Sequence, residues 1–411
     1  MRIKKSFRYR IYPNEEQKKS LSVQFGHSRF VYNYFLGKRI EFYQEHKDDP
    51  EKKSLNYYDT ANLLVDLKKD PDHIWLKEAD SQVLQQSLKN LDKAYKNFFS
   101  KRGKFPHFKK KTAEQSIHYP QRFKLVENKI YAPKVGWIKA VIHRAADGEI
   151  ENLSIKKTGT GKYFASFQCE VEIEDPKTRP GQVEGRSAPR RSTLEVGIDL
   201  GIQEFAVRSD GEIISNPRYF IKSEKKIQKA QRTLSRRVKG SSGWYKAKHK
   251  VALAHEKVRN QRNDFLHKTS RNLVDQYGYI AIENLNVAGM LKNHHLAKPI
   301  SDVGWSEFCR QLDYKGLWYG SEIKRIGRFE ASSKTCSVCG YKLESLALSI
   351  REWDCPQCST HHNRDRNAAV NILAFSMAGA AKRMNAGGEC IRPACQALLF
   401  EAGSPIPFGV G

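Results

Sequence analysis

The first hundred residues change from a strand-like to a helix-like pattern of apolar positions. Residues 1–12 alternate basic and apolar side chains, which predicts a strand with one face in water. Apolar positions at helical spacing follow Asn14 and recur through about residues 58–69 and 79–100, and Asn14 and Gln17 stand at the spacing of a capping box. We therefore expect residues 14–100 to form a helical lobe.

The pattern returns to short alternating segments between residues 115 and 175, separated by Gly and Asn turns. Such segments are typical of a small β-barrel or sandwich. We expect residues 1–13 to join residues 101–175 in an N-terminal β-barrel, with the helical lobe inserted into it. Residues 176–192 are rich in Pro, Gly and charge and have no apolar period, which predicts a linker.

The second half of the chain has the element order of an RNase H-like α/β domain. Three strands joined by tight turns come first, and helices then alternate with further strands. The sequence therefore predicts an α+β multidomain protein, with this domain formed by residues 193–330 and 361–378 and a flexible tail at 379–411. The expected segments are strands through 193–215, helices in 222–271, a strand at 277–285, a helix at 305–320, a strand at 322–329 and a last helix from 364.

The charge balance points to a polyanionic partner. The chain has 72 Lys and Arg against 45 Asp and Glu, a formal charge of +27. Residues 222–271 alone hold 16 Lys or Arg and three acids, a net of +13. Such charge repels itself unless a polyanion is present, and nucleic acid is the expected one. A basic protein of another kind remains the alternative at this point.

Hydropathy and the first residues indicate where the protein acts. We find no run of about 18 apolar residues, the length of a membrane-spanning helix. The N-terminus lacks the apolar stretch and cleavage site of a signal peptide. We expect a cytoplasmic, nucleoid-associated protein.

Two paired cysteine motifs form the most specific local signal. Cys336 and Cys339, then Cys355 and Cys358, have the spacing of a zinc ribbon, which we place at residues 331–360. Four thiolates close a tetrahedral shell, so the zinc would be structural. His361 and His362 lie close enough to replace a cysteine, but a complete set of four leaves them free for phosphate or backbone contacts. Cys390 and Cys395, in the tail, are expected to be idle thiols.

Three carboxylates stand at unusual places. Asp199 lies in an apolar strand, Glu283 ends another, and Asp365 begins the last helix. Singly, Asp365 could cap its helix, Glu283 could pair with a lysine, and Asp199 could accept backbone hydrogen bonds. In an RNase H-like sheet the first and fourth strands are neighbours and the last helix packs beside them, so all three acids would converge. Such a group suits catalytic Mg²⁺ or Mn²⁺ in phosphodiester cleavage.

The segment at residues 101–111 interleaves aromatic and basic residues. Stacking faces beside positive charges suit a nucleic-acid backbone, although aromatic residues that fill a core under a basic rim have the same pattern. The candidate nucleic-acid contacts here are Phe105, Phe108, Lys109 and Lys110.

These motifs together resemble the TnpB (OrfB) proteins of insertion-sequence transposons, which are relatives of type V CRISPR effectors. The resemblance runs in order from about residue 1 to 375, and it is the combination that is specific. The segments that carry it are FRYRIYPNEEQ, SRFVYNYFL, NLDKAYKNFF, FPHFKKK, VGIDLGI, SRRVKGS, IAIENL, SDVGWSEF, the paired CxxC motifs and NRDRNAAVNI.

The resemblance implies an RNA-guided endonuclease that uses a transposon-derived noncoding RNA. It implies cleavage of double-stranded DNA beside a short flanking motif, by a RuvC-like domain whose acids are Asp199, Glu283 and Asp365. It also implies that the N-terminal helices read the flanking motif. The further candidates for nucleic-acid contact are Tyr57, Gln85, Arg236 and Arg237.

Two other functions fit parts of the pattern. A regulator that binds nucleic acid without cutting would use the ribbon and the basic helices, but it gives no reason for the three acids. A single-strand transposase needs a His-x-His metal pair, which does not occur among the thirteen histidines. A strand-transfer transposase shares the RNase H-like fold, so only its reaction products separate it from an endonuclease.

Overall fold

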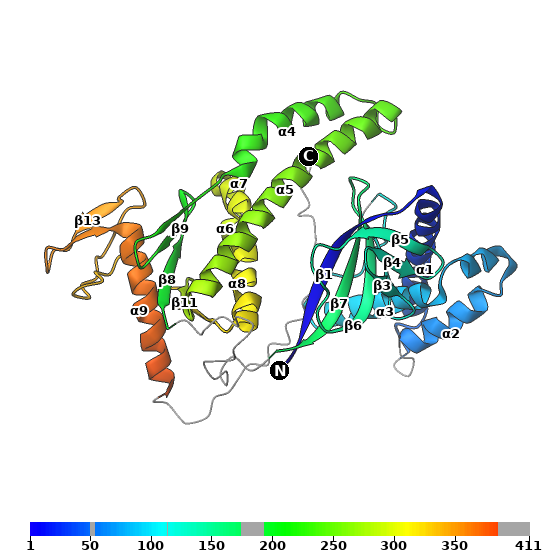
Figure 1. Ribbon diagram of the computed structural model, residues 1–411, viewed down its shortest axis with the longest axis horizontal. Coiled ribbons are helices and arrows are strands. Elements are labelled where there is room, and N and C mark those ends of the chain that lie inside the picture. Colours follow the sequence, from blue (N-terminus) through cyan, green and yellow to red (C-terminus); the bar gives the residue numbers. More distant parts are fainter. Residues whose placement is uncertain (50–53, 113, 174–192, 385–411) are drawn as a thin grey trace. The chain divides into compact units, whose positions relative to one another are not determined.

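The computed structural model divides the chain into two compact units, Met1–Ile173 and Glu174–Gly411 (Figure 1). The linker expected at 176–192 lies outside the described residues, as do Cys390 and Cys395. The structure describes all residues except 50–53, 113, 174–192 and 385–411.

The first unit contains a seven-stranded antiparallel sheet in the order β2-β6-β7-β1-β5-β4-β3. The N-terminal strand β1 lies inside this sheet, because it pairs with both β5 and β7. Residues far apart in the chain therefore form one sheet, as predicted. The strands are β1 (Arg2–Tyr12), β2 (Gln115–Tyr119), β3 (Lys124–Val126), β4 (Lys129–Ala132), β5 (Gly136–Val141), β6 (Glu149–Lys157) and β7 (Tyr163–Glu172).

The sheet curves around a single apolar core. Alternate residues of β1, namely Phe7, Tyr9 and Ile11, are buried in it, as the two-residue period of a strand requires. Tyr119 of the end strand β2 belongs to the same core, and Leu125 of the opposite end strand β3 packs against it. The end strands β2 and β3 do not pair with each other in this order, so the sheet is a half-barrel, and the full β-barrel expected from the sequence is not confirmed.

Most buried residues of the helices between β1 and β2 form a second core, whereas Leu21, Phe25 and Val83 pack into the core of the sheet. The predicted capping box is confirmed: Gln17 N donates to Asn14 Oδ1 at 2.8 Å, and Asn14 N donates to Gln17 Oε1 at 3.1 Å. A short 3₁₀ helix, which the apolar pattern did not predict, lies before the last helix. The elements are α1 (Glu15–Glu45), α2 (Tyr57–Leu67), the 3₁₀ helix η1 (Pro71–Glu78) and α3 (Ser81–Phe99).

The second unit is built on a five-stranded sheet in the order β10-β9-β8-β11-β12. Its first strand, β8, lies beside its fourth, β11, and the two run parallel, so the expected neighbourhood of these strands is confirmed. The strands are β8 (Glu195–Leu200), β9 (Glu204–Arg208), β10 (Ile213–Ser215), β11 (Tyr279–Ile282) and β12 (Glu322–Arg325).

Helices cover both faces of this sheet. Apolar residues of α5 and α8 pack on one face, and α9 contacts β8, β9 and β11 from the other (Figure 1). The last helix continues to Met384, past the boundary at residue 378 expected from the sequence. The helices are α4 (Tyr219–Ser235), α5 (Ser242–Gln276), α6 (Val287–Met290), α7 (His294–Val303), α8 (Trp305–Tyr319) and α9 (Arg364–Met384).

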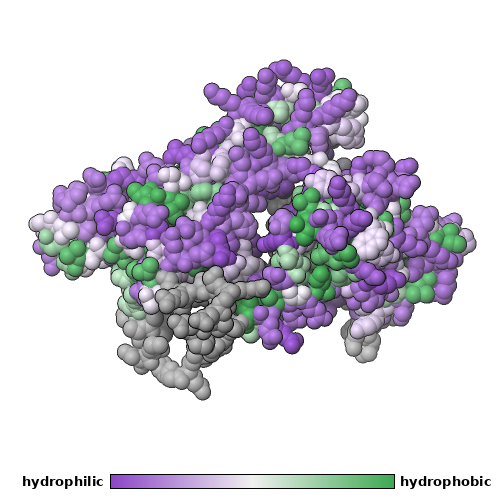
Figure 2. Space-filling view, viewed as in Figure 1, coloured by the Kyte–Doolittle hydropathy of each residue, from purple (hydrophilic) through white to green (hydrophobic). Residues whose placement is uncertain are grey.

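The basic segment forms the antiparallel pair α4 and α5, as predicted. Only Ile227 of α4 is buried among the described residues of that helix, so the pair exposes most of its charged side chains. Figure 2 shows hydrophilic residues covering most of this helical hairpin on the face in view. In the part of the chain that is described, no helix combines the length and apolar character needed to cross a membrane.

A small two-stranded sheet precedes α9. Strands β13 (Glu352–Asp354) and β14 (His361–Asn363) pair antiparallel, and the paired cysteines lie in the loops around them. The ribbon therefore extends to Asn363, three residues past its expected end.

Candidate active site and metal centre

Asp199 faces α9 because side chains alternate along β8. Val196 and Ile198 point into the apolar core beneath α5 and α8. Gly197 and Asp199 therefore point to the other face. On that face a Cβ atom added to Gly197 would lie 2.0 Å from the carbonyl oxygen of Ala369 in α9. The glycine lets the helix approach the strand that carries Asp199.

Glu283 follows β11 on the same face. Ala281 pairs with Gly197, and Ile282 pairs with Ile198, in the parallel register of β11 and β8. The next step of this register sets Glu283 beside Asp199. Glu283 is half-buried and accepts a hydrogen bond at Oε1 from Ser332 Oγ at 2.8 Å. Within the part of the chain that the structure describes, a serine hydroxyl and not a lysine therefore contacts Glu283.

Asp365 lies in the first turn of α9 but does not cap the helix. Asn363 takes that role, because its Oδ1 accepts from Arg366 N at 3.1 Å. The Asp365 carboxylate instead receives hydrogen bonds from Arg351 Nη1, which lies 3.2 and 3.3 Å from its two oxygens. Arg351 comes from the ribbon, just before β13.

The charges of the other two acids act on Asp199. Burial, together with the negative charges of Glu283 and Asp365, raises the pKa of Asp199 to about 8. Arg364 and Arg351 act in the opposite direction, but they do not offset the rise. A buried carboxylate beside two others favours a bound cation, since a cation stabilises the charged form of each. The residues present therefore fit a divalent metal with oxygen ligands.

The four paired cysteines lie together in the ribbon. Their sulfur atoms all lie within 4.8 Å of one another, with Cys336 Sγ 3.6 Å from Cys358 Sγ and Cys339 Sγ 3.5 Å from Cys355 Sγ. Zinc–sulfur bonds of about 2.3 Å in a tetrahedral shell put sulfur atoms about 3.8 Å apart, so the cluster fits zinc. In the part of the chain that the structure describes, these cysteines form the group whose possible ligand atoms come this close together. The carboxylate oxygens of the three acids lie farther apart.

Backbone turns and one histidine support the cysteine cluster. Cys336 N donates to Tyr341 O at 2.8 Å, and Gly340 takes a positive φ of 80° in the turn between them. His362 is buried against Trp353, and its Nε2 lies 3.0 Å from Cys336 Sγ. His362 therefore supports a ligand from the side, while the four thiolates remain the complete set.

Arg351 and Ser332 are two residues of this site that sequence reasoning missed. Each touches one of the acids, and each belongs to the segment that carries the cysteines. Ser332 stands in the run ASSKTC immediately before the first CxxC motif, but a serine there gives no signal of its partner. Their contacts depend on how the ribbon folds back over the sheet.

The aromatic and basic residues at 101–111 are partly packed and partly exposed. The ring of Phe105 contacts Tyr95 and Phe98 edge-on, with ring centroids 5.7 and 5.3 Å away, yet Phe105 is 46% exposed. Phe108 is 52% exposed. Both readings of the pattern, core packing and an open stacking face, therefore apply to Phe105.

The remaining candidates differ in how well they are held. Lys109 lies with its ammonium 3.8 Å from the ring centroid of Tyr32, and Lys110 is exposed. Tyr57 is half-buried against the helical core, whereas Gln85, Arg236 and Arg237 have exposed side chains. Arg236 and Arg237 lie at the end of α4, at the tip of the basic hairpin.

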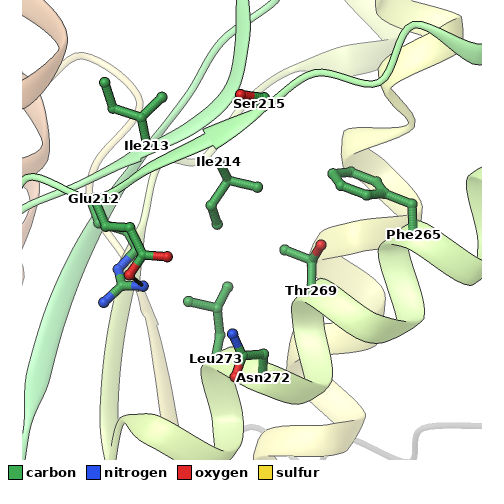
Figure 3. Close-up of a pocket in the computed structure, with 9 residues that line it drawn as sticks. Glu212, Ile213, Ile214, Ser215, Phe265, Thr269, Asn272 and Leu273 are labelled. Atoms are coloured by element: carbon green, nitrogen blue, oxygen red, sulfur yellow. Dashed lines mark hydrogen bonds and ion pairs between the residues drawn. The ribbon is translucent and has the colours of Figure 1, made fainter.

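A cavity of about 300 Å³ lies on the opposite face of the sheet from the acids (Figure 3). Arg208 lines the cavity and pairs with Ile198 of β8. Because the side chain of Ile198 faces α5, the cavity lies on the α5 side of the sheet. Ile214 from β10 and Phe265 from α5 form two of its walls. The cavity includes none of the three acids, and it is not the candidate active site.

Three family models match successive parts of the chain. Residues 1–48 match a model described as "Helix-turn-helix domain", and in the structure they form β1 and α1. Residues 166–294 match a model described as "Probable transposase". Residues 305–372, which include the ribbon, match one described as "Cas12f1-like, TNB domain".

Two relatives align with nearly the whole chain. A protein of Streptomyces pristinaespiralis named "Putative RNA-guided DNA endonuclease" is 37% identical over 399 residues, which cover 95% of this chain and 92% of the relative. "Putative RNA-guided DNA endonuclease InsQ" of Escherichia coli K12 is 34% identical over 391 residues, covering 91% and 92%. The chain belongs to this family, the TnpB (OrfB) proteins of insertion-sequence transposons.

A solved structure extends the comparison. The structure titled "Cryo-EM structure of the Cas12f1-sgRNA-target DNA complex" aligns at 17% identity with a TM-score of 0.35, covering 90% of this chain and 99% of that one.

Proposed function

We propose that this protein is an RNA-guided, divalent-metal-dependent endonuclease that cleaves double-stranded DNA beside a short flanking motif. The observation that carries the proposal is the raised pKa of Asp199 on the α9 face of the sheet, to which burial and the charges of Glu283 and Asp365 contribute. Relatives that align over nine-tenths of the chain are named RNA-guided DNA endonucleases, which supports the same activity.

The three acids would hold Mg²⁺ or Mn²⁺ in an RNase H-like, RuvC-type arrangement. When bound, two such ions activate a water molecule and stabilise the leaving oxygen of a phosphodiester. The chain's own part is to fix the ligands: β8 holds Asp199, the end of β11 holds Glu283, and the first turn of α9 holds Asp365. Arg351 offers a guanidinium at the same place for a phosphate oxygen.

The basic surfaces would hold the nucleic acids. The hairpin of α4 and α5 exposes most of a segment that carries a net charge of +13, with Arg236 and Arg237 at its tip. The first unit, with its barrel-like sheet and helical lobe, would read the flanking motif, with Tyr57 and Gln85 as candidate contacts. Phe105, Phe108, Lys109 and Lys110 would contact the nucleic-acid backbone there.

The guide would be a noncoding RNA from the transposon that encodes the protein, and the zinc would be structural. Four thiolates close the coordination shell of zinc, so no position remains open for a substrate. The protein would work in the cytoplasm at the nucleoid, where the transposon DNA lies.

A guide-exchange experiment tests this function. The protein is purified with its coexpressed RNA, and the RNA is sequenced to find a defined end that varies between insertions. Replacing that end with a new sequence should move cleavage of a plasmid, in the presence of Mg²⁺, to the new matching site. Cleavage that ignores the guide, joined transposon ends, or binding without cleavage would each overturn the proposal.

A further inference from the structure

The ribbon contacts Glu283 of the candidate active site through one hydroxyl group. Ser332 Oγ donates to Glu283 Oε1 at 2.8 Å, and Ser332 is only 5% exposed. Glu283 lies just past the end of its strand, so the strand ladder does not fix its side chain. A hydrogen bond from a buried donor restricts the carboxylate to one orientation, and one bonded oxygen leaves the other for a cation.

Ser332 is itself held from α9. Asn371 Nδ2 donates to Ser332 O at 2.7 Å and to Thr335 O at 2.6 Å. One turn earlier, Asn367 Nδ2 donates to Thr335 O at 2.7 Å, and Asn367 Oδ1 accepts from Ser337 N at 3.0 Å. Both asparagines are buried. Two amide side chains therefore clamp the backbone of residues 332–337 on the helix that carries Asp365.

The clamped segment leads directly into the cysteine cluster. Thr335 N donates to Ala331 O at 3.1 Å, and Cys336 N donates to Tyr341 O at 2.8 Å, so the turn before Cys336 and the first knuckle are continuous. A ribbon that lost its zinc would lose the constraint on Cys336, four residues from Ser332. Cys336 is therefore connected to Glu283 through the short segment 332–336 and the hydrogen bond from Ser332.

The chemical identity of the donor also matters. A lysine or arginine at position 332 would neutralise Glu283 and compete with a divalent cation for it. A serine hydroxyl carries no charge, so it orients the carboxylate and leaves its negative charge available. The hydroxyl is thus suited to a supporting role beside a metal ligand.

The geometry points to Ser332 as the positioning residue that orients Glu283 for divalent-metal binding, held in place by Asn371 and by the zinc-bound ribbon. This inference rests on the proposed function, because it takes Glu283 as a metal ligand. It adds a dependence of the acidic site on the ribbon that neither the three acids nor the four cysteines imply alone.

The test compares two adjacent serines in the RNA-bound protein. Ser332→Ala removes the hydroxyl, Ser332→Thr keeps one, and Ser333→Ala is the matched control at the half-buried neighbour. Mn²⁺ binding is measured by electron paramagnetic resonance, alongside zinc content, melting temperature and the Mg²⁺ dependence of cleavage. We expect Ser332→Ala to weaken Mn²⁺ binding about tenfold, with zinc content and melting temperature retained, while Ser332→Thr and Ser333→Ala stay close to the parent.

The outcomes separate the inference from the function. Equal Mn²⁺ binding in Ser332→Ala and the parent would overturn the inference even if the parent cleaves DNA. Weaker binding that appears only together with zinc loss would also overturn it, because the serine would then support the ribbon and not the acid. If Ser332→Ala binds Mn²⁺ more weakly than the parent but the parent never cleaves DNA, the inference is supported and the proposed endonuclease activity is wrong.

Discussion

Gly197 in β8 and Ala369 in α9 are in backbone contact, and a Cβ atom at Gly197 would lie 2.0 Å from the Ala369 carbonyl oxygen. Glycine at this position allows the last helix to lie directly against the first strand of the five-stranded sheet. Since β8 carries Asp199 and α9 carries Asp365, this contact sets the distance between two of the three acids.

Gly197→Ala should therefore destabilise the second unit. The methyl group must displace α9, because the atom it meets belongs to the backbone, and such overpacking costs about 1–3 kcal/mol. Gly243→Ala in α5 is the control: its new Cβ would meet Arg237 at an ordinary 3.6 Å, so stability should hold or rise by up to about 1 kcal/mol. Urea unfolding of both variants measures the difference. Equal stabilities would show that α9 is not held against β8 in this way.

The cysteine cluster should contain one zinc ion per chain, measurable by elemental analysis. The double variant Cys336→Ser, Cys339→Ser removes two of the four thiolates and should lose the metal. Cys309→Ala changes a cysteine of α8 outside the cluster and should keep it. Zinc retained by the double variant would mean that the metal is held elsewhere.

Arg351 should weaken metal binding when no nucleic acid is present. Its guanidinium bonds both oxygens of Asp365, so it competes with a cation for that carboxylate. Arg351→Ala should tighten Mn²⁺ binding about two- to fivefold, the worth of a partly exposed ion pair. Lys342→Ala, at an exposed lysine of the ribbon, should leave the affinity unchanged. A weaker affinity in Arg351→Ala would show that the arginine helps to build the site.

Lys315 should make the stability of the second unit depend on pH. Burial, and next the positive charge of Arg271, lower the pKa of Lys315 to about 8, while Asp275 and Glu307 act to raise it. Its Nζ donates to His267 O and Ser270 Oγ, both at 2.7 Å. Between pH 8 and the ordinary value of 10.5, the unfolded chain holds a proton that the folded protein has lost, so the free energy of unfolding rises with pH.

The variant Lys315→Met isolates this effect. Relative to the variant, the parent should gain stability from pH 7.5 to pH 10, by at most about 3 kcal/mol. Lys292→Met, at an exposed lysine, should show a constant difference from the parent. If the difference in stability between Lys315→Met and the parent is also independent of pH, folding does not lower the pKa of Lys315.

The parts of the fold that depend on local chemistry could be predicted from the sequence. The capping box of Asn14 and Gln17 needs only residues three apart, and it is present. The parallel neighbours β8 and β11 followed from the order of elements, so the common face of Asp199 and Glu283 could be expected. The alternating apolar positions of residues 1–12 predicted a strand with one buried face. This strand lies in a sheet whose other strands begin at residue 115, because its apolar face needs a core to pack against.

The contacts that support the acids could not be predicted in the same way. Ser332 reaches Glu283 across 49 residues of chain, and Arg351 reaches Asp365 across 14. Both contacts depend on the path of the ribbon over the sheet, and neither residue type signals its partner. The 3₁₀ helix Pro71–Glu78 was missed for a related reason, since its residues carry no apolar period of their own.

We propose that metal ions held by the three acids cleave the DNA, whereas other surfaces bind the nucleic acids. Asp199→Asn keeps the shape of the side chain and removes its charge, and Glu322→Ala removes an exposed acid from the same sheet as a control. Cleavage of a matched plasmid and binding of the same DNA are measured for both RNA-bound variants. We predict that Asp199→Asn loses at least about a hundredfold in cleavage rate with binding unchanged, while Glu322→Ala cuts like the parent. Undiminished cleavage by Asp199→Asn would show that Asp199 does not hold a metal ion needed for cleavage.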